Sequence, residues 1–155
     1  MSTIYTLNGK VLKNAANDKW LTKKEAPSGF VMNADNATII SNKATWEGPN
    51  YPDGYDGEGK TLQIIIKEAG CTFANLSIYY LNAADGTTNG PTALSAWNNP
   101  SGNYQVEAPI GTYTTTLSAN PAGGIYGKYL VLVRNGPDTT IDSTWLSKIE
   151  FRIID

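Results

Sequence analysis

The chain contains no histidine, a single cysteine and few charged residues among its 155 positions. Without histidine, the commonest general base and neutral metal ligand are missing, and no Ser-His or Cys-His nucleophile can form. Cys71 has no partner in the chain for a disulfide, so it is either a small buried hydrophobe or a free thiol. We expect burial, because Cys71 alternates with Phe73 and no basic cluster adjoins it to lower its pKa.

Charge is sparse and nearly balanced. The 12 basic and 14 acidic residues give a net charge of −2, and no basic run exceeds Lys23-Lys24. We therefore expect no nucleic-acid partner, and no apolar run is long enough to predict a membrane span. Residues 1–4 lack the charged start and apolar core of a secretion signal. We expect the protein to stay in the cytosol unless it leaves by lysis or within a larger particle.

Short apolar runs separated by turn residues predict an all-β fold. Residues 129–133 form an unbroken apolar run, and Ile149, Phe151 and Ile153 alternate with charged residues, as in a strand with one buried face. Further strands are expected at 30–32, 38–40, 61–67, 72–81, 104–106 and 113–117. No apolar pattern of helical period persists over three turns. The pattern predicts an antiparallel β-sandwich, a jelly roll, of about eight to ten strands.

The first residues form a separate unit. Two short apolar runs flank Asn8-Gly9, the pair that best fits the tight turn of a hairpin, and residues 22–29 have the composition of a linker. We therefore divide the chain into an N-terminal hairpin or arm at 1–28, a candidate docking segment, and a jelly-roll domain at 29–155.

A long polar stretch, residues 46–60, has no period, and loops of this length in compact domains are usually functional or disordered. Aromatic faces stack on the apolar side of a pyranose, and neutral polar groups bind its hydroxyls. Candidate glycan-binding residues here and in a second polar loop are Trp46, Tyr51, Tyr55, Trp97, Asn98 and Asn99. Alternatively, these aromatics plug the ends of the sandwich or contact a neighbouring subunit. Trp20 and Trp145 have strand-like surroundings and are expected in the core.

The same stretch holds three carboxylates. Asp53, Asp56 and Glu58 are interspersed with glycines, and hard cations such as Ca²⁺ prefer oxygen ligands, so these residues are candidate Ca²⁺ ligands. The spacing of an EF-hand is missing, and an ordinary acidic turn is the alternative. With Glu47 these residues could supply paired carboxylates for glycoside hydrolysis, but one short loop rarely places two carboxylates on opposite faces of a sugar. We expect no enzyme and no other cofactor.

A series of strand-like segments carries a family resemblance. TLQIIIKEAG, NLSIYYLNAADG, YTTTLSA, KYLVLVRNG and WLSKIEF follow one another between residues 60 and 151, ending near the pair Ile149 and Phe151. This region resembles carbohydrate-binding modules of the galactose-binding-like jelly-roll superfamily. The resemblance implies a jelly roll that binds glycans.

Residues 5–12, YTLNGKVL, with Lys19-Trp20-Leu21, are similar to the short N-terminal segment of many tailed-phage virion proteins. This resemblance implies a non-enzymatic virion accessory protein, such as a capsid decoration, head-fibre or tail component, assembled in the host cytoplasm. Its expected partners are capsid or tail proteins and, through weak binding, a cell-surface glycan. Such assemblies are usually symmetric, so we expect a homo-oligomer, a dimer or trimer. The alternative is a carbohydrate-binding module from a larger secreted glycoside hydrolase.

Overall fold

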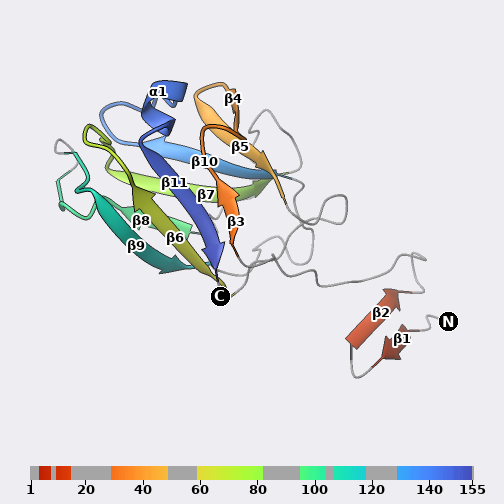
Figure 1. The fold of residues 1–155 in the computed structure, drawn as a ribbon. Coiled ribbons are helices and arrows are strands. Elements are labelled where there is room, and N and C mark those ends of the chain that lie inside the picture. Colours follow the sequence, from red (N-terminus) through yellow and green to blue (C-terminus); the bar gives the residue numbers. More distant parts are fainter. Residues whose placement is uncertain are drawn as a thin grey trace.

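The computed structural model describes residues 4–7, 10–14, 29–48, 59–81, 95–103, 107–117 and 129–154. Within these residues the chain forms eleven strands and one short helix (Figure 1). The elements are β1 (Ile4–Leu7), β2 (Lys10–Asn14), β3 (Phe30–Met32), β4 (Thr38–Ile40), β5 (Lys43–Glu47), β6 (Thr61–Ile66), β7 (Asn75–Leu81), β8 (Ser95–Asn98), β9 (Gly111–Thr116), β10 (Tyr129–Asn135), α1 (Ser143–Leu146) and β11 (Ile149–Ile154). No helix of the described part has the length and apolar character needed to cross a bilayer.

Two antiparallel sheets form a sandwich, which confirms the predicted fold class. One sheet has five strands in the order β4-β5-β10-β7-β8, and the other has four in the order β3-β11-β6-β9. β1 and β2 pair only with each other among the described strands, and Figure 1 shows their hairpin apart from the sandwich.

The strand order is that of a jelly roll. With β4 set aside as an extra edge strand, the eight strands from β3 to β11 have the orders 1-8-3-6 and 2-7-4-5 in the two sheets. The first strand pairs with the last, the second with the seventh, the third with the sixth and the fourth with the fifth. This is the arrangement obtained when one long antiparallel hairpin is rolled into two facing sheets.

Alternating side chains fill the space between the sheets. In β6, Leu62, Ile64 and Ile66 are buried while the residues between them are half exposed, and β11 contributes its alternate apolar residues in the same way. Leu130 and Leu132 of β10 belong to the same core from the facing sheet. In β6 and β11, the period-2 pattern therefore decided which face of the strand is buried.

Two strands were not expected from the sequence. β5 occupies residues placed partly in the polar loop, and β8 lies in a segment assigned to a loop. Both are rich in Ser, Thr, Asn or Lys, and they are strands because stronger neighbours pair with them: β10 with β5, and β7 with β8. The predicted strand at 104–106 lies outside the described residues.

Candidate functional site

Trp46 is a core residue, not a loop residue. It lies in β5 opposite Leu130 of β10, is 2% exposed and meets the ring of Phe151 edge-on with centroids 6.3 Å apart. Its indole N–H donates to the carbonyl oxygen of Asn33 and to Oδ1 of Asn36, both at 3.0 Å. Trp46 was predicted in a loop, but pairing of β5 with β10 turns its ring into the core, where almost no surface is left for a sugar to contact.

Asn99 is also structural. Its side chain is buried, its Nδ2 donates to the carbonyl oxygen of Phe73 at 2.9 Å, and its Oδ1 accepts from the amide of Ser101 at 2.9 Å. An Asn that bonds the backbone two residues ahead stabilises a turn. Asn99 therefore shapes the turn after β8, whereas its neighbour Asn98 is exposed.

Five of the predicted ligands lie outside the residues that the structure describes. The candidate glycan ligands Tyr51 and Tyr55 and the candidate Ca²⁺ ligands Asp53, Asp56 and Glu58 lie outside the described residues, as does Trp20. Within the residues that the structure describes, no group of three or more Cys, Asp or Glu side chains could hold a metal ion.

Among the described residues, Trp97 is the predicted aromatic ligand that the fold leaves partly accessible. It lies in β8, the edge strand of one sheet, and it is half buried against Tyr113 of β9, the edge strand of the other sheet. The two ring centroids are 5.2 Å apart at an interplanar angle of 48°. We call Trp97 and Tyr113 the aromatic pair. It joins the two sheets at one side of the sandwich.

The aromatic pair is held from behind and from the side. Phe73, fully buried, packs on Trp97 with a centroid distance of 5.6 Å. The Tyr113 hydroxyl donates to the carbonyl oxygen of Pro109 at 2.9 Å. Sequence reasoning missed Tyr113, although it is the one aromatic residue of β9 and its place in the alternation put it on the inner face with Thr115.

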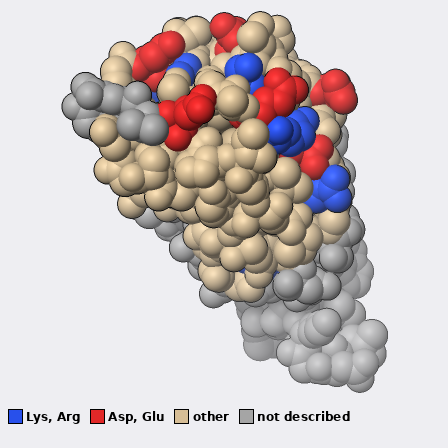
Figure 2. Space-filling model, turned by 60° about the vertical axis from the view of Figure 1, so that its left-hand side comes forward, with Lys and Arg blue, Asp and Glu red and all other residues tan. Residues whose placement is uncertain are grey.

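The two strands that carry the aromatic pair are polar and uncharged. β8 and β9 contain no charged residue, and Asn98, Ser101 and Asn103 are exposed on and just after β8. Figure 2, in which the β8–β9 side of Figure 1 comes forward, shows the charged side chains gathered toward one end and a wide uncharged area beside them. This surface suits a neutral ligand or a neutral protein partner.

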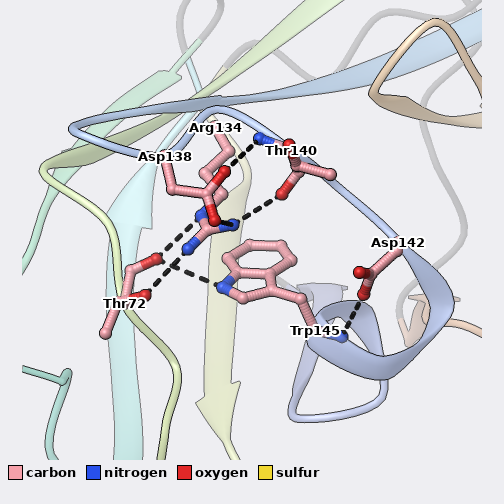
Figure 3. A network of polar contacts seen from close by, with 6 residues as sticks. All are labelled: Thr72, Arg134, Asp138, Thr140, Asp142 and Trp145. Atoms are coloured by element: carbon pink, nitrogen blue, oxygen red, sulfur yellow. Dashed lines mark hydrogen bonds and ion pairs between the residues drawn. The ribbon is translucent and has the colours of Figure 1, made fainter.

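The charged end of the sandwich contains a buried arginine (Figure 3). Arg134 of β10 is 4% exposed, and its Nε and Nη2 donate to the carbonyl oxygen and Oγ1 of Thr72, each at 2.8 Å. Its Nη1 donates to the carbonyl oxygen of Thr140 at 2.6 Å, and its guanidinium carbon lies 4.9 Å from the ring centroid of Trp145. These contacts connect the segment before α1 to the segment before β7. Arg134 is therefore a structural residue.

Asp138 completes this network from its exposed side. Its Oδ1 accepts from the amide of Thr140 at 2.9 Å, and its Oδ2 lies 3.4 Å from Nη1 of Arg134. The hydrogen bonds from Thr140 and the nearby Arg134 charge lower the pKa of Asp138. The carboxylate is therefore held in its charged form.

Trp145 is buried in the core, as predicted, but it lies in the short helix α1 and not in a strand. Asp142 caps that helix, since its Oδ1 accepts from the amide of Trp145 at 2.8 Å. The indole N–H of Trp145 donates to the carbonyl oxygen of Thr72 at 3.2 Å. This ring is thus one wall of the arginine network.

Cys71 is buried, as predicted. Burial raises the pKa of its thiol from 9.0 to about 12, against the opposing effect of the Arg134 and Lys148 charges. Since the thiolate is the nucleophile and the metal ligand, Cys71 is chemically inert in the folded protein at neutral pH.

Glu150 is the most enclosed carboxylate in the described ion pairs. Burial works to raise its pKa, but hydrogen bonds from Asn33 and Arg152 outweigh burial and lower it. Nδ2 of Asn33 donates to Oε1 at 3.1 Å, and Nη2 of Arg152 lies 2.9 Å from Oε2. Asn33 begins the turn after β3, and its bond to Glu150 attaches this turn to β11. Glu150 therefore has a structural role.

Comparison of the chain with protein-family models, with curated proteins and with solved structures finds no match.

Proposed function

We propose that this protein is a non-enzymatic accessory protein of a tailed-phage particle, a capsid decoration, head-fibre or tail component. In this proposal the jelly roll carries a weak glycan site at the aromatic pair. The observation that carries the glycan part is the half-buried contact between Trp97 and Tyr113 on an uncharged side of the sandwich. Jelly rolls host many unrelated functions, so the fold alone is not the argument.

The aromatic pair has the properties that sugar recognition requires. Its rings offer an apolar face for the C–H groups of a pyranose, while Asn98, Ser101 and Asn103 are nearby in sequence to bind hydroxyls. Contacts with Phe73 and Pro109 hold both rings in place before any ligand binds, which lowers the entropic cost of binding. Two partly covered rings make a small site, so the affinity is expected to be weak.

Docking to the particle is assigned to residues 1–28. The β1–β2 hairpin is a sheet of its own and does not extend either sheet of the sandwich, which supports an arm with a separate role. The likeness of residues 5–12 to tailed-phage virion proteins supports a capsid or tail protein as its partner.

The second candidate is a carbohydrate-binding module from a larger secreted glycoside hydrolase. The aromatic pair supports this candidate as well, because glycan binding is common to both. The two differ in where the protein is found: a virion protein copurifies with particles, whereas a module of a secreted hydrolase is found in the medium with its catalytic partner.

The glycan part is tested on a glycan array and by gel electrophoresis in polysaccharide, with two variants of one residue. Trp97→Phe keeps an aromatic face, whereas Trp97→Leu keeps apolar volume without that face. We expect Trp97→Leu to weaken binding at least about tenfold and Trp97→Phe to weaken it less. Circular dichroism serves as the folding control. Wild-type protein that binds no glycan, or Trp97→Leu that binds as wild type does, would contradict the assignment.

The particle part is tested separately. Antibodies against the full chain are applied to phage particles purified from a lysate of the host that makes the protein, with immunogold electron microscopy as the readout. Label at regular positions on the head or tail is the expected result. Label confined to the particle-free supernatant would refute the virion assignment and favour the secreted module.

A further inference from the structure

β9 ends the four-stranded sheet, and among the described strands it pairs only with β6. The amide of Leu117, directly after β9, donates to the carbonyl oxygen of Lys60, and the carbonyl oxygen of Leu117 accepts from the amide of Gly59, so both backbone groups of Leu117 point toward the β6 side. Hydrogen-bonded pairs alternate along an antiparallel ladder. The backbone N–H and C=O groups of Thr112, Thr114 and Thr116 therefore point away from β6, toward the open edge.

The side chains of the same three threonines are exposed. Within the part of the chain that the structure describes, β9 thus presents a row of backbone groups without a strand partner and a row of short, uncharged side chains. Ile110, directly before the strand, is 63% exposed and adds apolar surface at one end of this edge.

The other three edge strands of the sandwich are shorter than β9, which protects them against pairing with another chain. β3 and β4 have three residues each and β8 has four, whereas β9 has six. Natural proteins protect edge strands by keeping them short, or by charges, prolines or bulges. β9 has the sequence GTYTTT and keeps a regular register with β6 throughout, so it has none of these protections.

We propose that β9 pairs antiparallel with β9 of a second copy of this chain, joining the two four-stranded sheets into one continuous sheet. A two-fold axis at Thr114 places Thr112 of each copy opposite Thr116 of the other. Threonine pairs are favourable across antiparallel strands. In a two-fold contact the same surface of both copies meets, so a charged edge would face like charges. The β9 edge is uncharged and meets no such repulsion. A second copy is therefore the partner that this edge fits.

Six residues bury less surface than a stable dimer requires. The contact is accordingly weak between free molecules and becomes strong where copies are held side by side on a common support. The inference does not depend on glycan binding or on the particle, since it rests on the edge of the sheet alone.

The test measures association of the full chain from about 10 μM to about 1 mM, a range that detects weak dimers. Sedimentation velocity gives the dimer fraction, and hydrogen exchange gives the protection of individual amides. We expect a dimer that grows with concentration and slower exchange of the Thr112, Thr114 and Thr116 amides at the higher concentration. If the β9 amides exchange at the same rate at both concentrations, the proposal is overturned, even if the protein forms an oligomer through another surface.

Two matched variants locate the contact. Thr114→Glu sets two like charges against each other at the two-fold axis, whereas Gln63→Glu adds the same charge one strand inward, opposite Thr114 on β6. We expect Thr114→Glu to raise the dimer dissociation constant at least about tenfold and Gln63→Glu to change it less than about threefold. Equal effects of the two variants would overturn the proposed register.

A third variant addresses the backbone. Thr114→Pro removes the N–H that faces the open edge, and it leaves the hydrogen bonds between β9 and β6 in place. Edge strands accept proline at such positions. It should remain folded and monomeric. A Thr114→Pro protein that dimerises as wild type does would exclude strand pairing as the mode of contact. The exchange measurement on wild-type protein decides the question by itself should any variant fail to fold.

Discussion

Removal of the Arg134 side chain tests whether the buried network holds the segment before α1 against the sandwich. In Arg134→Ala, Thr72 and Thr140 both lose a charged donor, and Trp145 loses the cation over its ring. The carbonyl oxygen of Thr72 keeps the indole N–H of Trp145 at 3.2 Å, whereas nothing in the network replaces the bond to Thr140. The loss therefore consists of three broken hydrogen bonds from a charged donor, and the carbonyl oxygen of Thr140, an exposed residue, is left to bond water.

The magnitude follows from the burial and the number of contacts. A hydrogen bond to a charged group contributes about 1.5–3 kcal/mol, and the three bonds from the guanidinium belong to one network, so their contributions are not additive. We expect Arg134→Ala to lower the free energy of unfolding by about 4 kcal/mol, which is less than the sum of three separate bonds. Arg134→Lys should lose roughly half as much, because it keeps the charge but lacks the planar fork that reaches Thr72 and Thr140 together.

Asp138 provides the matched control. Its carboxylate is exposed, so Asp138→Asn should change stability little although it removes the ion pair. Urea unfolding monitored by tryptophan fluorescence measures all three variants, and the melting temperature of Arg134→Ala should fall by roughly 12 °C. A loss below about 1 kcal/mol for Arg134→Ala, or an equal loss for Asp138→Asn, would refute the argument that buried hydrogen bonds dominate this network.

Three further predictions concern single side chains. Trp46→Phe keeps a ring in the core but removes the indole donor to Asn33 and Asn36, so urea unfolding should show a loss of about 1–3 kcal/mol; an unchanged midpoint would contradict the core assignment. Cys71 should resist thiol reagents at pH 8 and react once urea unfolds the chain; rapid reaction of the native protein would contradict its burial. The folded-state pKa of Glu150 is depressed, so its charge stabilises the fold above its ordinary pKa of about 4.3, and this contribution is lost as pH falls through the folded pKa. The stability difference between wild type and Glu150→Gln should therefore shrink on acidification, and a difference independent of pH would refute this reasoning.

The fold was predictable where one strand carries its own signal. β6 and β11 alternate apolar and polar residues, and β10 is a short unbroken apolar run, so strand type and buried face followed from these segments alone. β5 and β8 lack such a signal because their strand conformation depends on the neighbours that pair with them. Their content of polar residues favoured a loop.

The candidate site was only partly predictable for the same reason. Trp97 was identified by its residue type and polar setting, but its contact with Tyr113 joins the edges of two different sheets. Trp46 and Asn99 have the same kind of local setting, yet hydrogen bonds and strand pairing make both structural. Residue type alone could not separate these outcomes.

The sequence by itself determined the all-β class, the buried faces of the strong strands and the burial of Cys71, because alternation and short apolar runs are local properties of the chain. Only the tertiary structure decided which strands are neighbours, which aromatic rings are covered and which edge is left open. Arg134 shows the physical reason: it is a charged residue at the end of a strand, and it can be buried only because Thr72, 62 positions away, supplies acceptors for its donors.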